Sequence, residues 1–299
     1  MFTIAYATPK DTAAVMALWG AAFGVDEPYF SWYFNNVYQA DRTLCLFSDN
    51  IMAASLQYAP YTLRLHGEEL DIAYLVGVCT GQAYQGRGFA HALINDIIRD
   101  LRRTYRLLML STDIPDFYRP FGFIHCYYLR RHTLRANPCP DIMRQWDIGL
   151  LTEAELDHCA RIYQKMTTDL DGYIIRSKTG WRHFFEDFLG DGGSLYLNPD
   201  AYLLWLIEDG VCKIKEIGYA DGNALYKALD LAKHIAATRG FSAIVWDAPL
   251  AAPLAITNTT VLPHVMVLSC EAVGHAAEIA EQTKKRFGNP KNLWVNEIT

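Results

Sequence analysis

The stretch Asp71–Ala90, DIAYLVGVCTGQAYQGRGFA, carries the pattern that decides the fold of this chain. It begins as an apolar run rich in β-branched residues, passes through Thr80-Gly81 into a turn, and then enters a glycine loop. Beyond the loop, positions 93, 94, 97, 98 and 101 are Leu or Ile at helical spacing. The stretch therefore predicts a strand, a glycine loop and a helix, in that order.

This order creates a binding site for an anion at the start of the helix. The first turn of a helix has backbone N–H groups without partners and carries the positive end of the helix dipole, so a phosphate can bind there. Gly86 and Gly88 would let the backbone approach the phosphate oxygens with no Cβ in the way, and Arg87 would add positive charge. A tight turn that binds nothing is the alternative, and the order of the three elements favours the phosphate site.

The loop does not match two common nucleotide motifs, G-x-x-x-x-G-K-[ST] and G-x-G-x-x-G. It resembles the acetyl-CoA signature of the GNAT N-acetyltransferase superfamily, [Q/R]-x-x-G-x-[G/A], through Gln85, Gly88 and Ala90. A second signature of that family, aromatic-Tyr-x-x-x-Gly-Phe, is matched by residues 117–123, FYRPFGF. The two motifs occur in the family's order, with one predicted helix and one predicted strand between them. The resemblance covers about the first 135 residues.

The resemblance implies acetyl-CoA as the co-substrate. Backbone groups at the end of the strand would hold the pantetheine arm and polarise the thioester carbonyl, and the loop would hold the pyrophosphate. The cofactor-binding residues that this implies are Val78, Cys79, Thr80, Gln85, Gly86, Arg87, Gly88, Phe89 and Ala90. Cys79 is not expected to act as a nucleophile, because a cysteine in an apolar strand is generally a small buried side chain.

Composition and charge exclude several other classes of protein. The chain has 51% apolar and 20% charged residues, which argues against disorder, and its net charge of -6 without a Lys/Arg block argues against a nucleic-acid partner. The seven cysteines form no C-x-x-C pair, so neither a disulfide framework nor a zinc site is expected. For the same reason we expect a cytoplasmic location. The histidines show no metal-ligand spacing, so we expect no metal. No secretion signal and no apolar run of about 18 residues occurs, which argues against a membrane protein.

The length of 299 residues suits two domains of about 140 residues each. The best boundary is Arg135–Asp141, RANPCPD, because its prolines interrupt both helices and ladders. We therefore expect an acetyl-CoA-binding GNAT domain at 1–135 and a degenerate GNAT-like domain with a terminal tail at 142–299. The expected fold class is α/β (α+β), with a mixed, mostly antiparallel sheet flanked by helices in each domain. Residues 124–134 are expected to close the first sheet.

The second half repeats the theme of the first with a weaker loop. Where the phosphate site should lie, the sequence is YADGNA from Tyr219, with one glycine beside Asp221 and no cation, so this loop is a poor pyrophosphate site. The arrangement resembles the tandem-GNAT proteins, which include the enhanced-intracellular-survival type of aminoglycoside acetyltransferases. The tail from His264 is too short for the sterol-carrier-like third domain of the larger relatives, which leaves aminoglycoside specificity unsupported.

The mechanism that the resemblance implies is direct attack of an amine on the thioester in a ternary complex. An amine with a pKa of about 10.4 is almost fully protonated at pH 7, so forming the neutral amine costs about 4.6 kcal/mol and a base is needed. The departing thiolate would be stabilised by Tyr118, the Tyr of the second motif, acting as the acid. The alternative for Tyr118 is a packed side chain whose hydroxyl bonds to the backbone.

Two residues compete for the role of base. In the tandem relatives the C-terminal carboxylate reaches the active site, which here implicates Thr299, whereas Glu27 lies in the loop expected beside the acceptor. The alternative for the segment from Trp294 is a last strand of the second sheet. Candidates for the wall of the acceptor site, with core packing as their alternative, are Asp26, Glu27, Tyr29, Phe30, Trp32 and Tyr33.

Two functions of different classes follow from the sequence. The first is an acetyl-CoA-dependent N-acetyltransferase, an acyltransferase, acting on the primary amine of a small molecule or a peptide. The second is a non-catalytic sensor or scaffold that binds CoA or acetyl-CoA through a degenerate tandem fold. The sequence names neither the amine nor the preferred acyl chain, and it leaves assembly into a homo-oligomer open.

Overall fold

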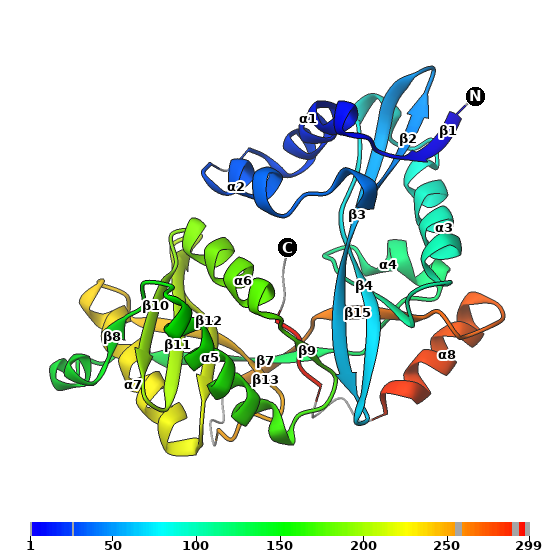
Figure 1. Ribbon diagram of the computed structural model, residues 1–299. Helices are drawn as coiled ribbons and strands as arrows, with labels where there is room; N and C mark the ends of the chain where they lie inside the picture. Colours follow the sequence, from blue (N-terminus) through cyan, green and yellow to red (C-terminus); the bar gives the residue numbers. More distant parts are fainter. Residues whose placement is uncertain (1, 26, 255–258, 289–292, 297–299) are drawn as a thin grey trace. The chain divides into compact units, whose positions relative to one another are not determined.

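The computed structural model describes residues 2–25, 27–254, 259–288 and 293–296 of the chain. Contacts divide these residues into two units, each with its own sheet (Figure 1). The first unit comprises residues 2–126 and 265–288, and the second comprises residues 127–264 and 293–296. The units differ from the domains expected at 1–135 and 142–299 in two segments, 127–135 and 265–288, which belong to the opposite unit.

The sheet of the first unit is mostly antiparallel. Its strands, in spatial order, are β1 (Phe2–Tyr6), β2 (Thr43–Ser48), β3 (Ile51–Leu65), β4 (Glu68–Thr80), β5 (Leu107–Ser111), β15 (Val265–Ser269) and β6 (Ile124–His125). Only the pairing of β4 with β5 is parallel within this series, because α3 (Phe89–Leu101) connects these two strands. The strand, loop and helix predicted from residues 71–101 are therefore confirmed.

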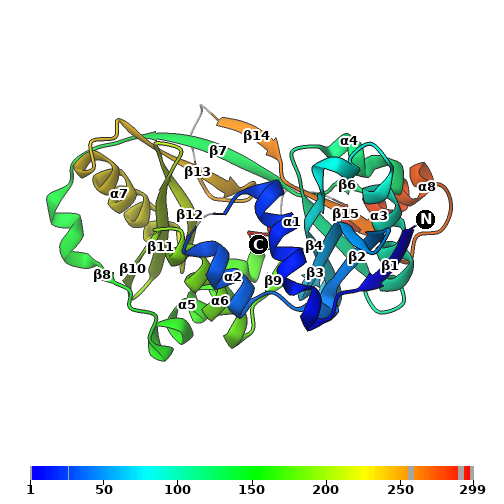
Figure 2. The ribbon, with the colours of Figure 1, turned by 90° about the horizontal axis from the view of Figure 1, so that it is seen from above.

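Helices cover both faces of this sheet (Figure 2). On one face, α3 contributes Leu93, Ile94 and Ile97 to a core that also contains Leu44 and Leu46 of β2. On the other face, α1 (Thr12–Phe23) and α2 (Tyr29–Asn36) form an aromatic cluster over Cys45, the residue between those two leucines. This alternation along β2 is the period of two that a strand buried on both sides requires. The short helix α4 (Pro115–Tyr118) follows β5, and α8 (Ala276–Phe287) packs on β15.

The prediction that residues 124–134 close the first sheet is confirmed for Ile124–His125, the last strand of that sheet, and is wrong for the rest of the segment. The segment divides into β6, which pairs with β15 in the first unit, and β7 (Tyr128–Arg135), which lies in the second unit between β13 and β14. In the first sheet, β15 lies between β5 and β6. With a partner on each side, β7 satisfies backbone groups along both of its edges, and such long-range pairing cannot be read from local alternation.

The second unit repeats the plan of the first. Its strands, in spatial order, are β14 (Thr259–Pro263), β7, β13 (Ala243–Pro249), β12 (Val211–Tyr219), β11 (Ala201–Glu208), β10 (Ser194–Asn198) and β8 (Asp147–Ile148). Again one pairing, β12 with β13, is parallel, and a helix, α7 (Gly222–Thr238), makes the connection. Two mixed, mostly antiparallel sheets flanked by helices confirm the predicted fold class.

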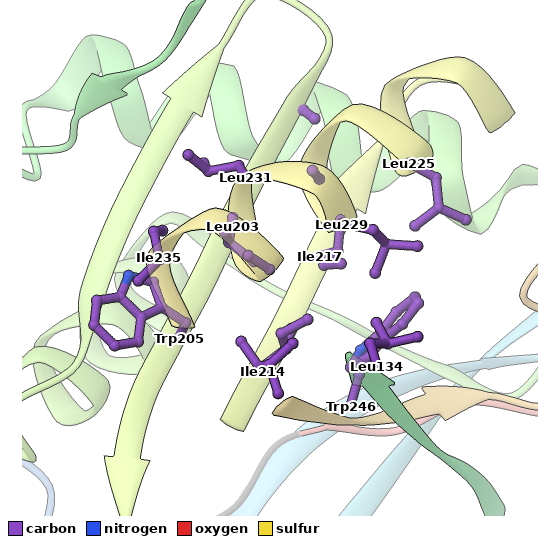
Figure 3. Close-up of a cluster of buried hydrophobic side chains, with 14 of the residues drawn as sticks. Leu134, Leu203, Trp205, Ile214, Ile217, Leu225, Leu229, Leu231, Ile235 and Trp246 are labelled. Carbon is purple, nitrogen blue, oxygen red and sulfur yellow. The ribbon is translucent and has the colours of Figure 1, made fainter. Parts of the chain in front are cut away.

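Figure 3 shows how α7 packs on its sheet. Leu225, Leu229 and Ile235 of the helix lie over Leu203 of β11 and Ile217 of β12 in one buried cluster. A separate cluster of mostly aromatic side chains is formed by α5 (Glu153–Met166) and α6 (Lys178–Gly190), and a short strand, β9 (Tyr173–Ile175), precedes α6. Each face of the second sheet therefore has its own helical cover.

A fully buried ion pair lies within the aromatic cluster of α5 and α6. The side chain of Arg176 is 2% exposed and that of Glu216 is 0% exposed, and the guanidinium binds the carboxylate through two contacts of 2.7 and 2.8 Å. The guanidinium carbon also lies 3.8 to 4.6 Å from the ring centres of Tyr163, Trp181 and Phe184. The aromatic rings and the carboxylate together replace the water that the cation has lost.

The carboxylate of Glu216 is also satisfied by two neutral donors. Tyr202 donates its hydroxyl to Oε1 at 2.6 Å, and Asn296 donates Nδ2 to Oε2 at 2.9 Å. Burial alone would raise the pKa of Glu216, but the charge of Arg176 and these hydrogen bonds outweigh it and lower the pKa below its ordinary value. Through Asn296, the network anchors the segment Leu293–Asn296 to the second unit.

We predict that Arg176→Met destabilises the protein by about 3–5 kcal/mol, because it leaves the Glu216 carboxylate buried without its partner. Arg182→Met is the matched control, since Arg182 is 38% exposed and pairs with Glu153 at the surface, where such a pair contributes about 0–1 kcal/mol. Urea unfolding at pH 7 measures both. Because the pKa of Glu216 is lowered, its contribution is present at neutral pH and is lost as the pH falls through the folded-state pKa. Equal destabilisation by the two substitutions would contradict this account of the network.

Candidate functional site

The N-terminus of α3 has no cap from a side chain. The helix begins at Phe89, its N-cap residue is Gly88 in the left-handed conformation, and its first turn contains no acidic residue. The N–H groups of Phe89, Ala90 and His91 therefore lack acceptors within the helix, and the positive end of the helix dipole is not neutralised. These are the groups that bind a phosphate at other helix N-termini.

The two glycines before α3 provide the space that an anion needs. Gly86 has φ 74° and Gly88 has φ 79°, and a Cβ built on either would meet no atom within 4 Å. Both residues therefore adopt backbone conformations that favour glycine, and both border open space. The loop therefore leaves room for the anion that the sequence predicts at this position, and the anion site stays a prediction.

Side chains of the loop hold it beside the end of β4. Gln85 donates its Nε2 to the carbonyl oxygen of Thr80 at 3.4 Å, which ties the loop to the strand. The guanidinium carbon of Arg87 lies 5.3 Å from the ring centre of Tyr84, and that ring stacks on Phe89. The exposed charge of Arg87 is therefore kept at the loop, next to the free end of α3.

The end of β4 offers backbone groups that no neighbouring strand uses. The ladder between β4 and β5 runs from Ile72 to Tyr74 only, whereas β4 continues to Thr80. Between Tyr74 and Thr80, the backbone groups that face β5 have no strand partner among the described residues. Val78, Cys79 and Thr80, expected to contact the pantetheine arm, all lie in this segment, and a buried hydroxyl, that of Thr80, has no hydrogen-bond partner in the described ranges.

Cys79 has the features of a structural cysteine. It is 5% exposed, its Sγ lies 3.2 Å from the Oγ of Ser55, and burial raises the pKa of its thiol. A thiol that stays neutral is a poor nucleophile. These features agree with the expectation that Cys79 does not react covalently.

Tyr118 lies at the end of α4, in the core of the first unit. Its side chain is 6% exposed, and its ring packs against Phe117 and Phe123 with ring centres 4.9 and 6.0 Å away. Burial raises the pKa of its phenol to about 12. Among the described residues its hydroxyl has no hydrogen-bond partner, so the expected alternative, a bond to the backbone, is not seen there.

His91, in the first turn of α3, packs against the turn that carries Tyr118 and was not among the predicted site residues. Its ring lies edge-on to Phe117 at 4.7 Å and 5.3 Å from Phe121, so the first turn of α3 packs directly on the turn that carries Tyr118. His91 lies one position after the acetyl-CoA signature, which was the only signal for it.

The candidate wall of the acceptor site divides into two sets. Phe30 and Tyr33 are buried in the aromatic cluster, which agrees with core packing, the alternative to a place in the acceptor wall. Tyr29 and Trp32 are only half-buried. Glu27 is exposed just before α2, and its carboxylate accepts hydrogen bonds from the Oγ of Ser31 at 2.8 Å and from the backbone N–H of Ser31 at 3.3 Å. Asp26 lies outside the described residues.

Thr299 also lies outside the described residues, which end at Asn296. The described part of the tail packs into the second unit, where Trp294 is 3% exposed and lies 5.7 Å from the ring of Tyr163. The alternative of a last strand is not realised between Leu293 and Asn296, because this segment makes a single bridge, from Leu293 to Asp171.

The corresponding loop of the second unit has the opposite chemistry. Asp221 is the N-cap of α7 and accepts a hydrogen bond from the N–H of Ala224 at 2.8 Å, so a carboxylate occupies the place where α3 has free N–H groups. A cavity of about 230 Å³ beside it is lined by Asp200, Asp221 and Lys227 among other polar residues. The carboxylate agrees with the expectation of a poor pyrophosphate site.

The described ranges contain neither a cluster of metal-binding side chains nor a helix suited to a membrane. No group of three or more His, Cys, Asp or Glu side chains is placed there to hold a metal ion. None of the helices in these ranges has the length and apolar character needed to span a bilayer.

Comparison with known proteins relates this site to a family. Residues 3–126 match the acetyltransferase (GNAT) domain family, and no curated protein sequence matches the chain. Similar solved structures include a probable N-acyltransferase from Enterococcus faecalis, with 18% identity, a TM-score of 0.69 and coverage of 91% of this chain and 73% of that one. A GCN5-related N-acetyltransferase from Kribbella flavida has 15% identity and a TM-score of 0.70, covering 90% and 71%. Eis1 from Mycobacterium abscessus has 16% identity and a TM-score of 0.66, covering 91% and 74%. At these identities the likeness concerns the fold.

We predict that Gly88→Asp weakens CoA binding by much more than tenfold, because it places a carboxylate at the free end of α3 where the pyrophosphate should bind. Gly88→Asn is the matched control, since Asn has the same shape and also tolerates the left-handed backbone but carries no charge. Isothermal titration calorimetry with CoA compares the two proteins. Unchanged affinity in Gly88→Asp would remove this loop from the binding site.

Proposed function

We propose that this chain is an acyltransferase that transfers an acetyl group from acetyl-CoA to a primary amine, and the match of residues 3–126 to the acetyltransferase (GNAT) domain family supports the proposal. The observation that carries the proposal is the uncapped N-terminus of α3 behind two left-handed glycines, next to the unpaired end of β4. A pyrophosphate requires the first feature and an extended pantetheine arm the second. Both lie in one continuous segment, residues 75–91.

In the proposed reaction the amine attacks the thioester directly, in a ternary complex. A C–N bond forms, the C–S bond breaks, the amine loses a proton to a base, and the sulfur leaves as a thiolate. Backbone N–H groups at the end of β4, beyond its ladder with β5, would stabilise the negative charge that develops on the carbonyl oxygen. Val78, Cys79 and Thr80 supply this part of the site, and residues 85–90 hold the pyrophosphate.

Tyr118 is the proposed acid for the thiolate. With a phenol pKa of about 12 and a thiol pKa of about 8.5, complete proton transfer to sulfur is uphill by about 5 kcal/mol. Tyr118 therefore acts by donating a hydrogen bond that strengthens as charge develops on sulfur. Its hydroxyl is suited to this because it has no hydrogen-bond partner among the described residues.

Of the two candidate bases, Glu27 is the one that lies among the described residues, and it is the proposed base. Its carboxylate is exposed at the start of α2, where it could hold the ammonium group of an acceptor and take up its proton. Thr299 remains its competitor, outside the described residues. A cytoplasmic location belongs to the same proposal and is supported by the absence of disulfides, since all seven cysteines are described and free.

The alternative, a sensor or scaffold that binds acetyl-CoA without turnover, shares the loop but has no use for a hydroxyl at Tyr118. Release of thiol from acetyl-CoA in the presence of a panel of primary amines separates the two functions. Amine-dependent release supports the transferase, whereas tight binding of acetyl-CoA without release for any amine supports the sensor.

We predict that Tyr118→Phe lowers kcat by about 10²-fold and leaves KM for acetyl-CoA unchanged, because the lost hydrogen bond matters only as charge develops on sulfur. Tyr105→Phe, another partly buried Tyr on the same core, is the control and should keep the native kcat. Because burial raises the pKa of Tyr118 to about 12, the phenol stays protonated at working pH. The kcat profile should therefore show no limb from this residue below about pH 10. A native kcat in Tyr118→Phe would leave it a packing residue.

We predict that Glu27→Gln lowers kcat/KM for the amine at least tenfold, because the amide cannot accept the proton. Ser31→Ala is its control: it removes the hydroxyl that donates a hydrogen bond to Glu27 but keeps the carboxylate, so it should have a much smaller effect. Steady-state rates at saturating acetyl-CoA compare the two variants. If Glu27→Gln turns over at the native rate, the base lies elsewhere and Thr299 becomes the residue to test.

A further inference from the structure

We propose that Trp19 is a positioning residue for acyl transfer, which fixes the bulge at Gly77 of β4 and so sets the backbone that faces the thioester. This inference rests on the proposed function and deepens it. Its consequence is that α1 and α2, the helices expected beside the acceptor, also determine the geometry of the thioester site.

The bulge lies immediately before the segment that should contact the thioester. In the ladder between β3 and β4, Ser55 pairs with Cys79 and Gln57 pairs with Val76, so β4 has one more residue than β3 in this interval. Within it, Gly77 has φ 59°, a left-handed conformation that favours glycine. A bulge of this kind bends the strand and turns the groups that follow it. Here the groups that follow belong to Val78.

Trp19 of α1 covers this bulge directly. A Cβ built on Gly77 would lie 2.2 Å from Cζ3 and 2.7 Å from Cε3 of the indole, so no side chain fits between the ring and the backbone. Trp19 is only 8% exposed. The indole thus restricts movement of the Gly77 backbone, and the positive φ of Gly77 keeps the strand bent under the ring.

A closed series of buried contacts holds the indole in place. The ring of Trp19 lies 4.9 Å from that of Tyr33 in α2, and the hydroxyl of Tyr33 donates to Oε1 of Gln57 at 2.9 Å. Gln57 is paired with Val76, the residue just before Gly77. The contacts therefore run from the bulge through α1, α2 and β3 and return to the bulge. Tyr33 and Gln57 are both 3% exposed, which leaves this series little freedom to rearrange.

The phosphate loop is not part of this series. It is held by its own contacts, from Gln85 to Thr80 and from Arg87 to Tyr84. Loss of the indole should therefore disturb the position of the thioester and leave most of the affinity for CoA intact. A shift of about 1 Å at a reacting centre can cost about 10² in rate, which makes kcat the sensitive quantity.

The experiment compares Trp19→Leu with Phe34→Leu. Phe34 belongs to the same aromatic cluster, with its ring 5.8 Å from that of Trp19, but it is not among the atoms nearest to Gly77. Both substitutions should lower the melting temperature. We expect Trp19→Leu to lower kcat at least tenfold with the Kd for CoA unchanged, and Phe34→Leu to keep kcat within about twofold of native.

A spectroscopic measurement tests the position of the backbone without an amine. The backbone amide of Val78 should show a chemical-shift difference between the CoA and acetyl-CoA complexes in the native protein and in Phe34→Leu. This difference should be lost or strongly reduced in Trp19→Leu. Equal loss of kcat in both variants, or a native kcat and a native shift difference in Trp19→Leu, would overturn the inference.

A second pair of variants tests the contact itself. Gly77→Ala creates the clash with the indole, and Trp19→Leu in the same chain makes room for the added methyl group. We expect the loss of kcat in the double variant to be clearly smaller than the product of the two single losses. Independent, multiplicative losses would show that the two residues do not act together.

Failure of this inference can be told apart from failure of the proposed function. If the native protein binds acetyl-CoA but acetylates no amine, the transferase proposal fails, and the Val78 amide still decides the role of Trp19 in positioning the thioester. If the native protein acetylates an amine and Trp19→Leu behaves like Phe34→Leu, only the inference fails. A native protein that does not bind acetyl-CoA refutes both.

Discussion

The candidate site depends on two sets of backbone polar groups that have no partner in a strand or helix among the described residues, one at the end of β4 and one in the first turn of α3. Buried N–H and C=O groups are almost always paired, so a run of them without partners in the fold is available for a ligand. One set lies on the edge of β4 that faces β5, after the two strands separate at Tyr74, and the other lies in the first turn of α3. Three glycines with positive φ, at positions 77, 86 and 88, allow the backbone conformation of this part of the chain. On its other edge β4 pairs with β3 from Glu68 to Thr80 apart from the bulge at Gly77, and this ladder holds the strand in place.

The two units show how little chemistry separates a ligand site from a structural one. Both have a strand, a turn and a helix leading to a parallel neighbour, α3 in the first unit and α7 in the second. In α3 the N-cap is Gly88 and the N–H groups remain free, whereas in α7 the side chain of Asp221 fills the same role internally. A cap of this kind stabilises a helix by about 1 kcal/mol. At α3 the first unit forgoes that stabilisation, and in the proposed function the pyrophosphate would replace it.

Local patterns predicted the glycine loop, the buried Cys79 and the fold class, because each depends on residues that are neighbours in sequence. The pairing of β7 in the second sheet and of β15 in the first was not predictable, since both depend on partners more than a hundred residues away. Trp19 and His91 were missed for a related reason. Each acts through a contact, with Gly77 and with Phe117, that no spacing along the chain reveals. The sequence indicated Glu27 as a candidate base, but its hydrogen bond with Ser31 of α2 appears only in the structure.

Burial also determines the protonation of the groups around the proposed thioester site. The same desolvation raises the pKa of the Tyr118 phenol to about 12 and that of the Cys79 thiol above its ordinary value, so both remain neutral at physiological pH. A neutral phenol can donate a hydrogen bond to sulfur, and a neutral thiol does not compete with the amine for the acyl group. In the proposed reaction, an apolar, tightly packed surrounding would therefore favour transfer to an incoming amine over transfer to the protein itself. This selectivity follows from the core packing of residues that are not themselves reactive, such as Phe117 and Phe123 around Tyr118.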